Sequence, residues 1–358
     1  MKGPAMKGPA MSALERLPTR LGWELELMAP AGATRLDLAQ ALAVQLGASV
    51  HRIWLPQSEP SLVPNQPVFE NLTLGFELRD AQGDWLLRCV DDLTLQGGLD
   101  RKARPVAGWY RIVSDDLRLL HLIARHCDAE APLEHVLEPV AEIFGSQVTQ
   151  GPGGMRRIAD PNDLPIAIGA PLPGERHRPC EVVSAPLGAA RSRELLGLVC
   201  AQAQALGFTV PAESATHLHL DASLIQDARV VANLVALWQR WGERIKQQVQ
   251  TNPRCVRLGP FEDAVLDVVR QPDFVGLDWE AAQERLKKAR PSKYRDINLR
   301  NAVFPFLGKP TVEMRVLPTS LDAEQVWQGL EAMGAVVEMA RQGRIPESQG
   351  ELDGALGF

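Results

Sequence analysis

Side chains that can bind divalent cations or phosphate recur at alternate positions in three short, otherwise apolar segments, residues 23–27, 217–221 and 312–316. Their polar members are Glu24 and Glu26, then His217, His219 and Asp221, and then Glu313 and Arg315. Alternate residues of a β-strand point to one face of the sheet, so each segment is predicted to be a strand with one apolar and one charged face. A solvated sheet face is the simpler interpretation of such alternation. It usually carries Thr, Lys, Ser and Gln, whereas these faces carry almost only residues that bind metal or phosphate.

The carboxylates of these segments would repel one another if the strands pair, because neighbouring strands lie about 5 Å apart. Glu181 adds a further carboxylate on a fourth short apolar strand. A bound Mg²⁺ would relieve the repulsion, since a small hard cation takes oxygen ligands. The residues predicted to hold two divalent ions, together with one histidine, are Glu24, Glu26, Glu181 and Glu313.

Arg315 adds the capacity to bind phosphate, because the planar guanidinium matches the geometry of phosphate oxygens. Metal ions that bridge phosphate oxygens, with an arginine at the transferring group, are what phosphoryl transfer from ATP requires. The pattern therefore predicts an enzyme that uses ATP with Mg²⁺ or Mn²⁺.

Hydrophobic periodicity and turn residues predict the elements that must position these side chains. Strands are expected at residues 21–28, 85–90, 107–113, 181–184, 216–221, 296–299 and 311–317. Helices are expected at residues 34–47, 133–144, 189–207, 224–250, 261–270, 278–289 and 321–342. Residues 56–75 contain four prolines and are expected to form a loop. Strands and helices follow one another without a regular β-α-β rhythm, which favours an α+β fold over a doubly wound sheet.

The predicted organisation is one catalytic domain over residues 15–345. A disordered tail at 1–14 and a loose C-terminal tail at 346–358 flank this domain. Residues 150–180 are rich in glycine and proline and are expected to form a long loop or lid within it.

Composition excludes several classes of protein. The 358 residues carry a formal net charge of -6, which argues against nucleic acid or an anionic membrane as the main partner. No apolar run reaches the roughly 18 residues of a membrane span. The five cysteines are scattered without a CxxC pair, unlike a disulfide framework or a zinc site. A cytoplasmic protein is expected.

Five segments around these residues resemble, in order, the motifs of the amidoligase family, part of the glutamine synthetase-like carboxylate–amine ligase superfamily. The segments are GWELE at 22–26, EVVSAP at 181–186, HLHLDAS at 217–223, KYRDINL at 293–299 and TVEMR at 311–315, followed by TSLD at 319–322. The resemblance implies a strongly curved, mostly antiparallel sheet with helices packed on its convex side and the active site in its concave face. It also implies that ATP converts a carboxylate into an acyl phosphate. An amine (an amino acid, a peptide or ammonia) would then displace phosphate to give an amide or isopeptide bond.

The resemblance also assigns roles to individual residues. One metal ion would lie among Glu24, His219 and Glu313, and another between Glu26 and Glu181. The catalytic residues would be Arg315, Arg295 and Glu313, with both arginines on the transferring phosphate. The residues that bind ATP or substrate would be Arg295, Asn298, Arg315, Lys293 and His217.

Two alternatives to a ligase stay open at this point. One is a phosphotransferase of the same architecture, and the other is a non-catalytic protein that binds a peptide or metabolite. Asp91 or Asp92 could supply a further acidic group after a tryptophan-containing strand, and the sequence does not choose between them. Neither the acid nor the amine can be named from the sequence.

Overall fold

The computed structural model describes residues 11–60, 68–114, 116–255, 257–305 and 310–358. Its internal contacts divide the chain into two compact units, and the single catalytic domain expected from the sequence stays a prediction. Unit 1 comprises Met1–Leu25, Ser184–Ala201 and Glu213–Phe358, and unit 2 comprises Glu26–Val183 and Gln202–Ala212. The α+β class and a mostly antiparallel sheet are confirmed.

The strands of unit 1 are those whose residues alternate between charged and apolar. They are hydrogen-bonded in the order β11 (Ile297–Asn298), β12 (Thr311–Pro318), β10 (Ala215–Asp221) and β1 (Leu21–Met28, of which the last three residues belong to unit 2). Trp23 pairs with Leu218, which pairs in turn with Met314, and all three side chains are fully buried. Because the apolar members share the core face, the charged members share the opposite face.

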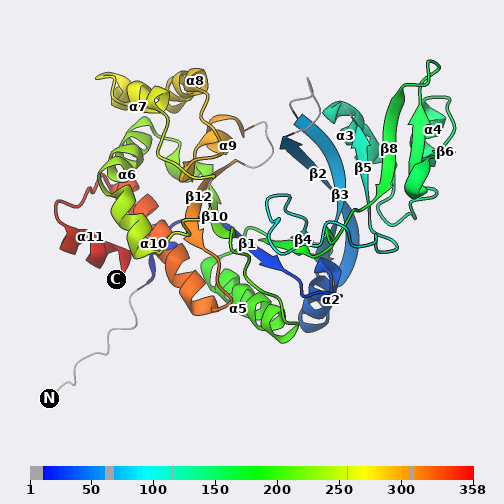
Figure 1. Ribbon diagram of the computed structural model, residues 1–358. Helices are drawn as coiled ribbons and strands as arrows, with labels where there is room; N and C mark the ends of the chain where they lie inside the picture. Colours follow the sequence, from blue (N-terminus) through cyan, green and yellow to red (C-terminus); the bar gives the residue numbers. More distant parts are fainter. Residues whose placement is uncertain (1–10, 61–67, 115, 256, 306–309) are drawn as a thin grey trace. The chain divides into compact units, whose positions relative to one another are not determined.

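Helices complete unit 1. They are α1 (Ala13–Arg16), most of α5 (Ala189–Ala205), α6 (Ala228–Gln248), α7 (Asp263–Val269), α8 (Trp279–Ala289), α9 (Arg300–Val303), α10 (Ala323–Gln342) and α11 (Gln349–Leu356). The longest two, α6 and α10, pack against each other, and α10 also contacts β12 (Figure 1). Asp322 caps the start of α10 by accepting from two backbone N–H groups, and Gly343 ends it in the left-handed region at φ 67°.

The described residues just before residue 15 and after residue 345 are more ordered than the sequence suggested. Leu14 of α1 is buried, and its backbone N–H donates to Glu331 of α10 at 3.0 Å. The C-terminal helix α11 buries Leu352 and Leu356. Residues 346–358 therefore form a packed helix rather than a loose tail, because two leucines four positions apart share one helix face. Residues 1–10 of the predicted N-terminal tail lie outside the described residues.

Unit 2 is built around a long hairpin of β2 (Ser49–Pro60) and β3 (Val68–Arg79) (Figure 1). Its strand order is β9 (Pro179–Ser184), β4 (Trp85–Val90), β3, β5 (Tyr110–Ser114), β8 (Pro165–Pro171), β7 (Arg156–Ala159) and β6 (Thr149–Gln150), with β2 also on β3. Its helices are α2 (Arg35–Leu46), α3 (Leu117–His126) and α4 (Glu138–Ile143). Every helix among the described residues is too short or too polar to cross a membrane.

The two faces of β3 have different surroundings. Leu72 and Leu74 point to one face, where they pack in a core that includes Leu120 and Ile123 of α3. Asn71 and Thr73 point to the opposite face and are also buried. We call this opposite face, which carries Asn71 and Thr73, the Asn71 face.

Residues 150–180 do not form the long loop that the sequence led us to expect. They contain β7, β8 and the start of β9, with a short 3-10 turn at Pro152–Gly154. Gly153 and Gly154 occupy a turn, with φ of 65° and 83°, values that glycine adopts without strain.

Candidate active site

The strand register of unit 1 sets charged residues opposite one another. Glu24 of β1 pairs with His217 of β10, and His219 of β10 lies between Gly22 of β1 and Glu313 of β12.

The side chains of these two glutamates and two histidines make direct contact. The Oε2 of Glu24 lies 3.0 Å from the Nδ1 of His217, and its Oε1 lies 3.2 Å from the Nε2 of His219. The Oε1 of Glu313 lies 3.3 Å from the Nδ1 of His217 and 3.9 Å from the Nε2 of His219. We call these four residues the carboxylate–histidine cluster. Both histidines contact both glutamates, so the division of roles between His219 as metal ligand and His217 as substrate contact stays a prediction.

Glu313 is the most tightly held member of the carboxylate–histidine cluster. The residue is 4% exposed, and its carboxylate accepts a hydrogen bond from the Nδ2 of Asn298 at 2.7 Å and another from the Nη1 of Arg315. Burial alone would raise the pKa of Glu313, but its electrostatic interactions with His219, Arg315 and His217 outweigh burial and hold the pKa below its ordinary value. The carboxylate is therefore ionised and able to serve as a ligand at neutral pH.

Asp296 anchors the strands that carry Asn298 and Arg315. The backbone N–H of Arg315 donates to the Asp296 carbonyl at 2.9 Å. The Asp296 carboxylate accepts from the backbone N–H of Gly259 at 2.8 Å and from the indole N–H of Trp238 at 3.2 Å. Sequence reasoning did not single out Asp296, although it lies inside the KYRDINL segment, and its contacts come from residues far away in the chain.

The donor atoms of the carboxylate–histidine cluster fit a divalent cation. Glu24, His217 and Glu313 each offer a ligand atom, and these atoms lie within 4.8 Å of one another. The carboxylate oxygens are ligands that both Mg²⁺ and Mn²⁺ prefer. The imidazole nitrogen is a ligand that Mn²⁺ accepts. The residues present therefore fit the metal ion that the sequence predicted.

A second carboxylate pair lies in unit 2. Carboxylate oxygens of Glu26 and Glu181 lie within 4.8 Å of each other, and their role as ligands of a second ion stays a prediction. The thiols of Cys180 and Cys89 are in hydrogen-bonding contact, and Cys89 pairs with Phe76 on the helix-covered face of β3. Glu181, one residue on from Cys180, therefore points toward the Asn71 face.

The remaining predicted residues make other contacts. The Nε of Arg295 lies 2.8 Å from the Oε1 of Glu262, so this guanidinium is paired with a carboxylate rather than placed at Glu313. Lys293 is exposed, and its ammonium lies 5.2 Å from the centre of the Tyr294 ring. Their roles toward ATP stay predictions.

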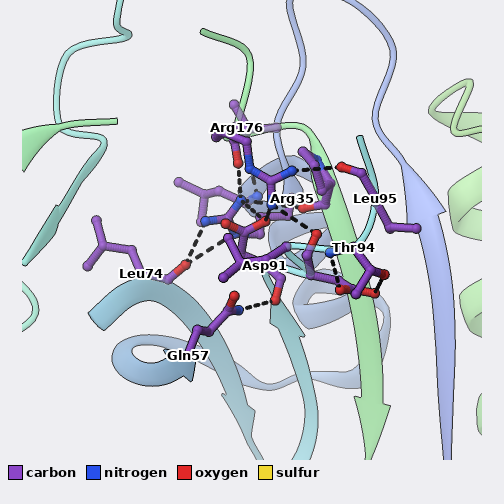
Figure 2. A network of polar contacts seen from close by, with 12 residues as sticks. Arg35, Gln57, Leu74, Asp91, Thr94, Leu95 and Arg176 are labelled. Carbon is purple, nitrogen blue, oxygen red and sulfur yellow. Dashed lines mark hydrogen bonds and ion pairs between the residues drawn. The ribbon is translucent and has the colours of Figure 1, made fainter. Parts of the chain in front are cut away.

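Asp91 and Asp92, between which the sequence did not choose, have different roles. Asp91 is 1% exposed and lies in a buried polar network, with its Oδ1 2.5 Å from the Nη2 of Arg176 and 4.0 Å from the Nη1 of Arg35 (Figure 2). Burial raises the pKa of Asp91, although Arg176 and Arg35 oppose the shift. The Asp92 carboxylate instead accepts from the backbone and hydroxyl of Thr94 in a local turn.

Arg35 is the residue of this network that sequence reasoning missed. Its fully buried guanidinium donates to the backbone carbonyls of Leu74, Arg176 and Pro179 and lies 4.6 Å from the centre of the Trp109 ring. The contact with Pro179 fixes the start of β9, two residues before Glu181. A lone arginine at the start of a helix gives no sequence signal for such a role.

Comparison with protein families adds an independent observation. The model of a family described as "Putative amidoligase enzyme" matches residues 17–337, which include every candidate residue of both units. Comparisons with curated proteins and with solved structures gave no match. Because the match covers most of the chain, this protein belongs to that amidoligase family.

Proposed function

We propose that this protein is an ATP-dependent carboxylate–amine ligase. It would form an amide or isopeptide bond on a small molecule or peptide through an acyl-phosphate intermediate. The observation that carries the proposal is the carboxylate–histidine cluster with Arg315 bonded to Glu313, in a chain of the amidoligase family. The same proposal includes a glutamine synthetase-like sheet and a single catalytic domain. The family match supports this part of the proposal, because it spans both units.

Mg²⁺ or Mn²⁺ would be held by Glu24, Glu313 and a histidine of the carboxylate–histidine cluster, and a second ion by Glu26 and Glu181. When bound, such ions neutralise the charge of the ATP phosphates. The protein's own contribution is to keep the Glu313 carboxylate ionised and fixed, as its lowered pKa and its bonds to Asn298 and Arg315 support.

Arg315 would act on the transferring phosphoryl group. A substrate carboxylate oxygen attacks the γ-phosphorus, the bond to ADP breaks, and an acyl phosphate forms. The amine then attacks the acyl carbon, phosphate leaves, and the amine gives up a proton. The Arg315 guanidinium, oriented by its bond to Glu313, would stabilise the negative charge that develops during the first of these steps.

Hydroxylamine offers a direct test when the amine is unknown, because it captures acyl phosphates as hydroxamates. Purified protein, Mg²⁺ and ATP would be incubated with a panel of carboxylic acids, with and without hydroxylamine. We expect ADP release and hydroxamate formation to depend on the same acid. A stable phosphorylated product instead would favour a phosphotransferase. No nucleotide turnover with any acid by folded protein would favour a non-catalytic binder.

A further inference from the structure

In the described part of the chain, two buried polar side chains in the middle of β3 have no hydrogen-bond partner. Both amide atoms of Asn71 and the hydroxyl of Thr73 lack a partner among the described residues, and the two side chains are 0% and 1% exposed. Buried polar groups are hydrogen-bonded in most native proteins, since an unmade bond is destabilising. Their neighbours Leu72 and Leu74 show that β3 readily carries apolar residues, so the polar pair calls for a specific explanation.

The sheet register sets further polar groups beside this pair. On one side of β3, Gln57 of β2 lies opposite Asn71, and its amide donates to the backbone carbonyl of Asp91 (Figure 2). On the other side, Arg111 of β5 lies directly opposite Thr73. Cross-strand partners share a face, so all of these side chains belong to the Asn71 face.

The chemistry of the pair specifies what could satisfy it. The Nδ2 of Asn71 needs an acceptor, its Oδ1 needs a donor, and the Thr73 hydroxyl can supply either. Arg111 adds a positive charge on the same face, which favours a carboxylate as the acceptor. A phosphate group offers mainly acceptors at neutral pH and would leave Oδ1 unsatisfied. A carboxylate with a neighbouring ammonium supplies both kinds of partner.

We propose that Asn71, Thr73 and Arg111 form a subsite that binds the α-amino-carboxylate group of a free amino acid. The subsite lies on the sheet face toward which Glu181 points, two strands from β9 in the order β9-β4-β3. This inference rests on the proposed function, and it assigns an α-amino acid moiety to one of the two substrates of the ligase.

Thermal unfolding in the presence of small ligands tests the subsite without any turnover. The probes are the twenty proteinogenic amino acids at 10 mM, inorganic phosphate, and Mg²⁺ with ATP. For each amino acid that stabilises the wild type, the carboxylic acid without its amino group and the amine without its carboxylate are tested as well. We expect at least one amino acid to raise Tm, and neither of its counterparts nor phosphate to do so.

Two variants test the residues. Thr73→Val and Asn71→Leu remove the polar groups but keep the approximate shape, so the ligand-free proteins should be at least as stable as the wild type. The affinity for the amino acid, measured by calorimetry, should fall at least tenfold in both. Thr216→Val is the matched control, because the Thr216 hydroxyl is buried but bonded to Thr319 at 3.3 Å. This control should lose stability and keep amino acid binding.

The outcomes separate this inference from the proposed function. If Mg²⁺ with ATP stabilises the wild type but none of the twenty amino acids does, the subsite is refuted and the ligase stands. Amino acid binding that survives unchanged in Thr73→Val and Asn71→Leu also refutes the subsite, as does a less stable ligand-free Thr73→Val. If amino acid binding depends on Asn71 while Mg²⁺ and ATP never bind, the subsite is supported and the ligase is refuted.

Discussion

Replacing Glu313 by glutamine separates the metal-binding role of this residue from its structural role. Glutamine keeps the shape and can still bond Asn298 or Arg315, but it removes the charge that these neighbours and two histidines surround. The pKa of Glu313 is lowered, so the folded protein stabilises the ionised carboxylate relative to water, and neutralising it should destabilise the fold.

The expected loss of stability follows from the contacts. Hydrogen bonds to charged groups contribute about 1.5–3 kcal/mol and neutral ones about 0.5–1.5 kcal/mol, while the neutral amide is also easier to bury. We therefore expect Glu313→Gln to lower the free energy of unfolding by about 1–2 kcal/mol. Removing a residue that hydrogen-bonds to a metal ligand typically reduces metal affinity about 10–100-fold. Glu313→Gln replaces a proposed ligand itself, so it should reduce the affinity for Mg²⁺ at least as much.

Glu77→Gln is the matched control. Glu77 is a buried glutamate of unit 2 whose carboxylate oxygens each lie 2.6 Å from a guanidinium, of Arg79 and of Arg88. Both variants should lose similar stability in urea unfolding. Only Glu313→Gln should lose the Mg²⁺-dependent part of the Tm increase that ATP produces. The reasoning is refuted if that Mg²⁺ dependence is the same in Glu313→Gln as in the wild type.

Further predictions concern catalysis, pH and the C-terminus. Arg315→Lys keeps the charge but loses the planar fork, so kcat should fall about 10³-fold or more while the Kd for ATP changes less than tenfold; wild-type steady-state kinetics would contradict this. Burial raises the pKa of Glu77, but its two arginines hold it below the ordinary 4.5. The stability advantage of wild type over Glu77→Gln should therefore be full above about pH 4.5 and disappear as the pH falls through the lowered folded pKa, which urea unfolding at several pH values would detect; an advantage that grows in acid would have the wrong sign. Deleting residues 346–358 removes buried Leu352 and Leu356 and should lower the free energy of unfolding by about 3–6 kcal/mol, whereas unchanged stability would show that α11 is dispensable.

The central part of the candidate site could be predicted from alternation alone. Three strands with one apolar face each must bury that face, so their charged faces come together once the strands pair. This is why Glu24, His217 and Glu313 meet in the structure. The register that sets Glu24 opposite His217 joins residues far apart in the chain, and no local signal fixes it.

Prolines and glycines misled the prediction elsewhere. Residues 56–75 were expected to form a loop, yet β2 and β3 run through most of them as a hairpin. The described pairing of β2 is with β3, on one side, and such an edge strand tolerates Pro56 and Pro60 because a missing N–H on its free side breaks no bond. In the same way, the glycines at 153 and 154 mark turns between strands rather than a long loop.

Single polar residues inside strands and helices could not be recognised. Asn71 and Arg35 have ordinary neighbours in the sequence, and their importance appears only once burial and hydrogen bonding are known. Arg295 lies inside a matching motif, yet it is paired with Glu262, a contact that its motif does not encode.

The transfer of oxygen from the substrate carboxylate to phosphate tests the proposed ligase most directly. With an acid that supports hydroxamate formation, the carboxylate would be labelled with ¹⁸O and the products analysed by mass spectrometry. An acyl-phosphate route moves one labelled oxygen from the acid into the released phosphate, because the amine displaces phosphate at the acyl carbon. We predict singly labelled phosphate and an amide that keeps the other label. Unlabelled phosphate, with both labels retained in the acid or its product, would contradict the account.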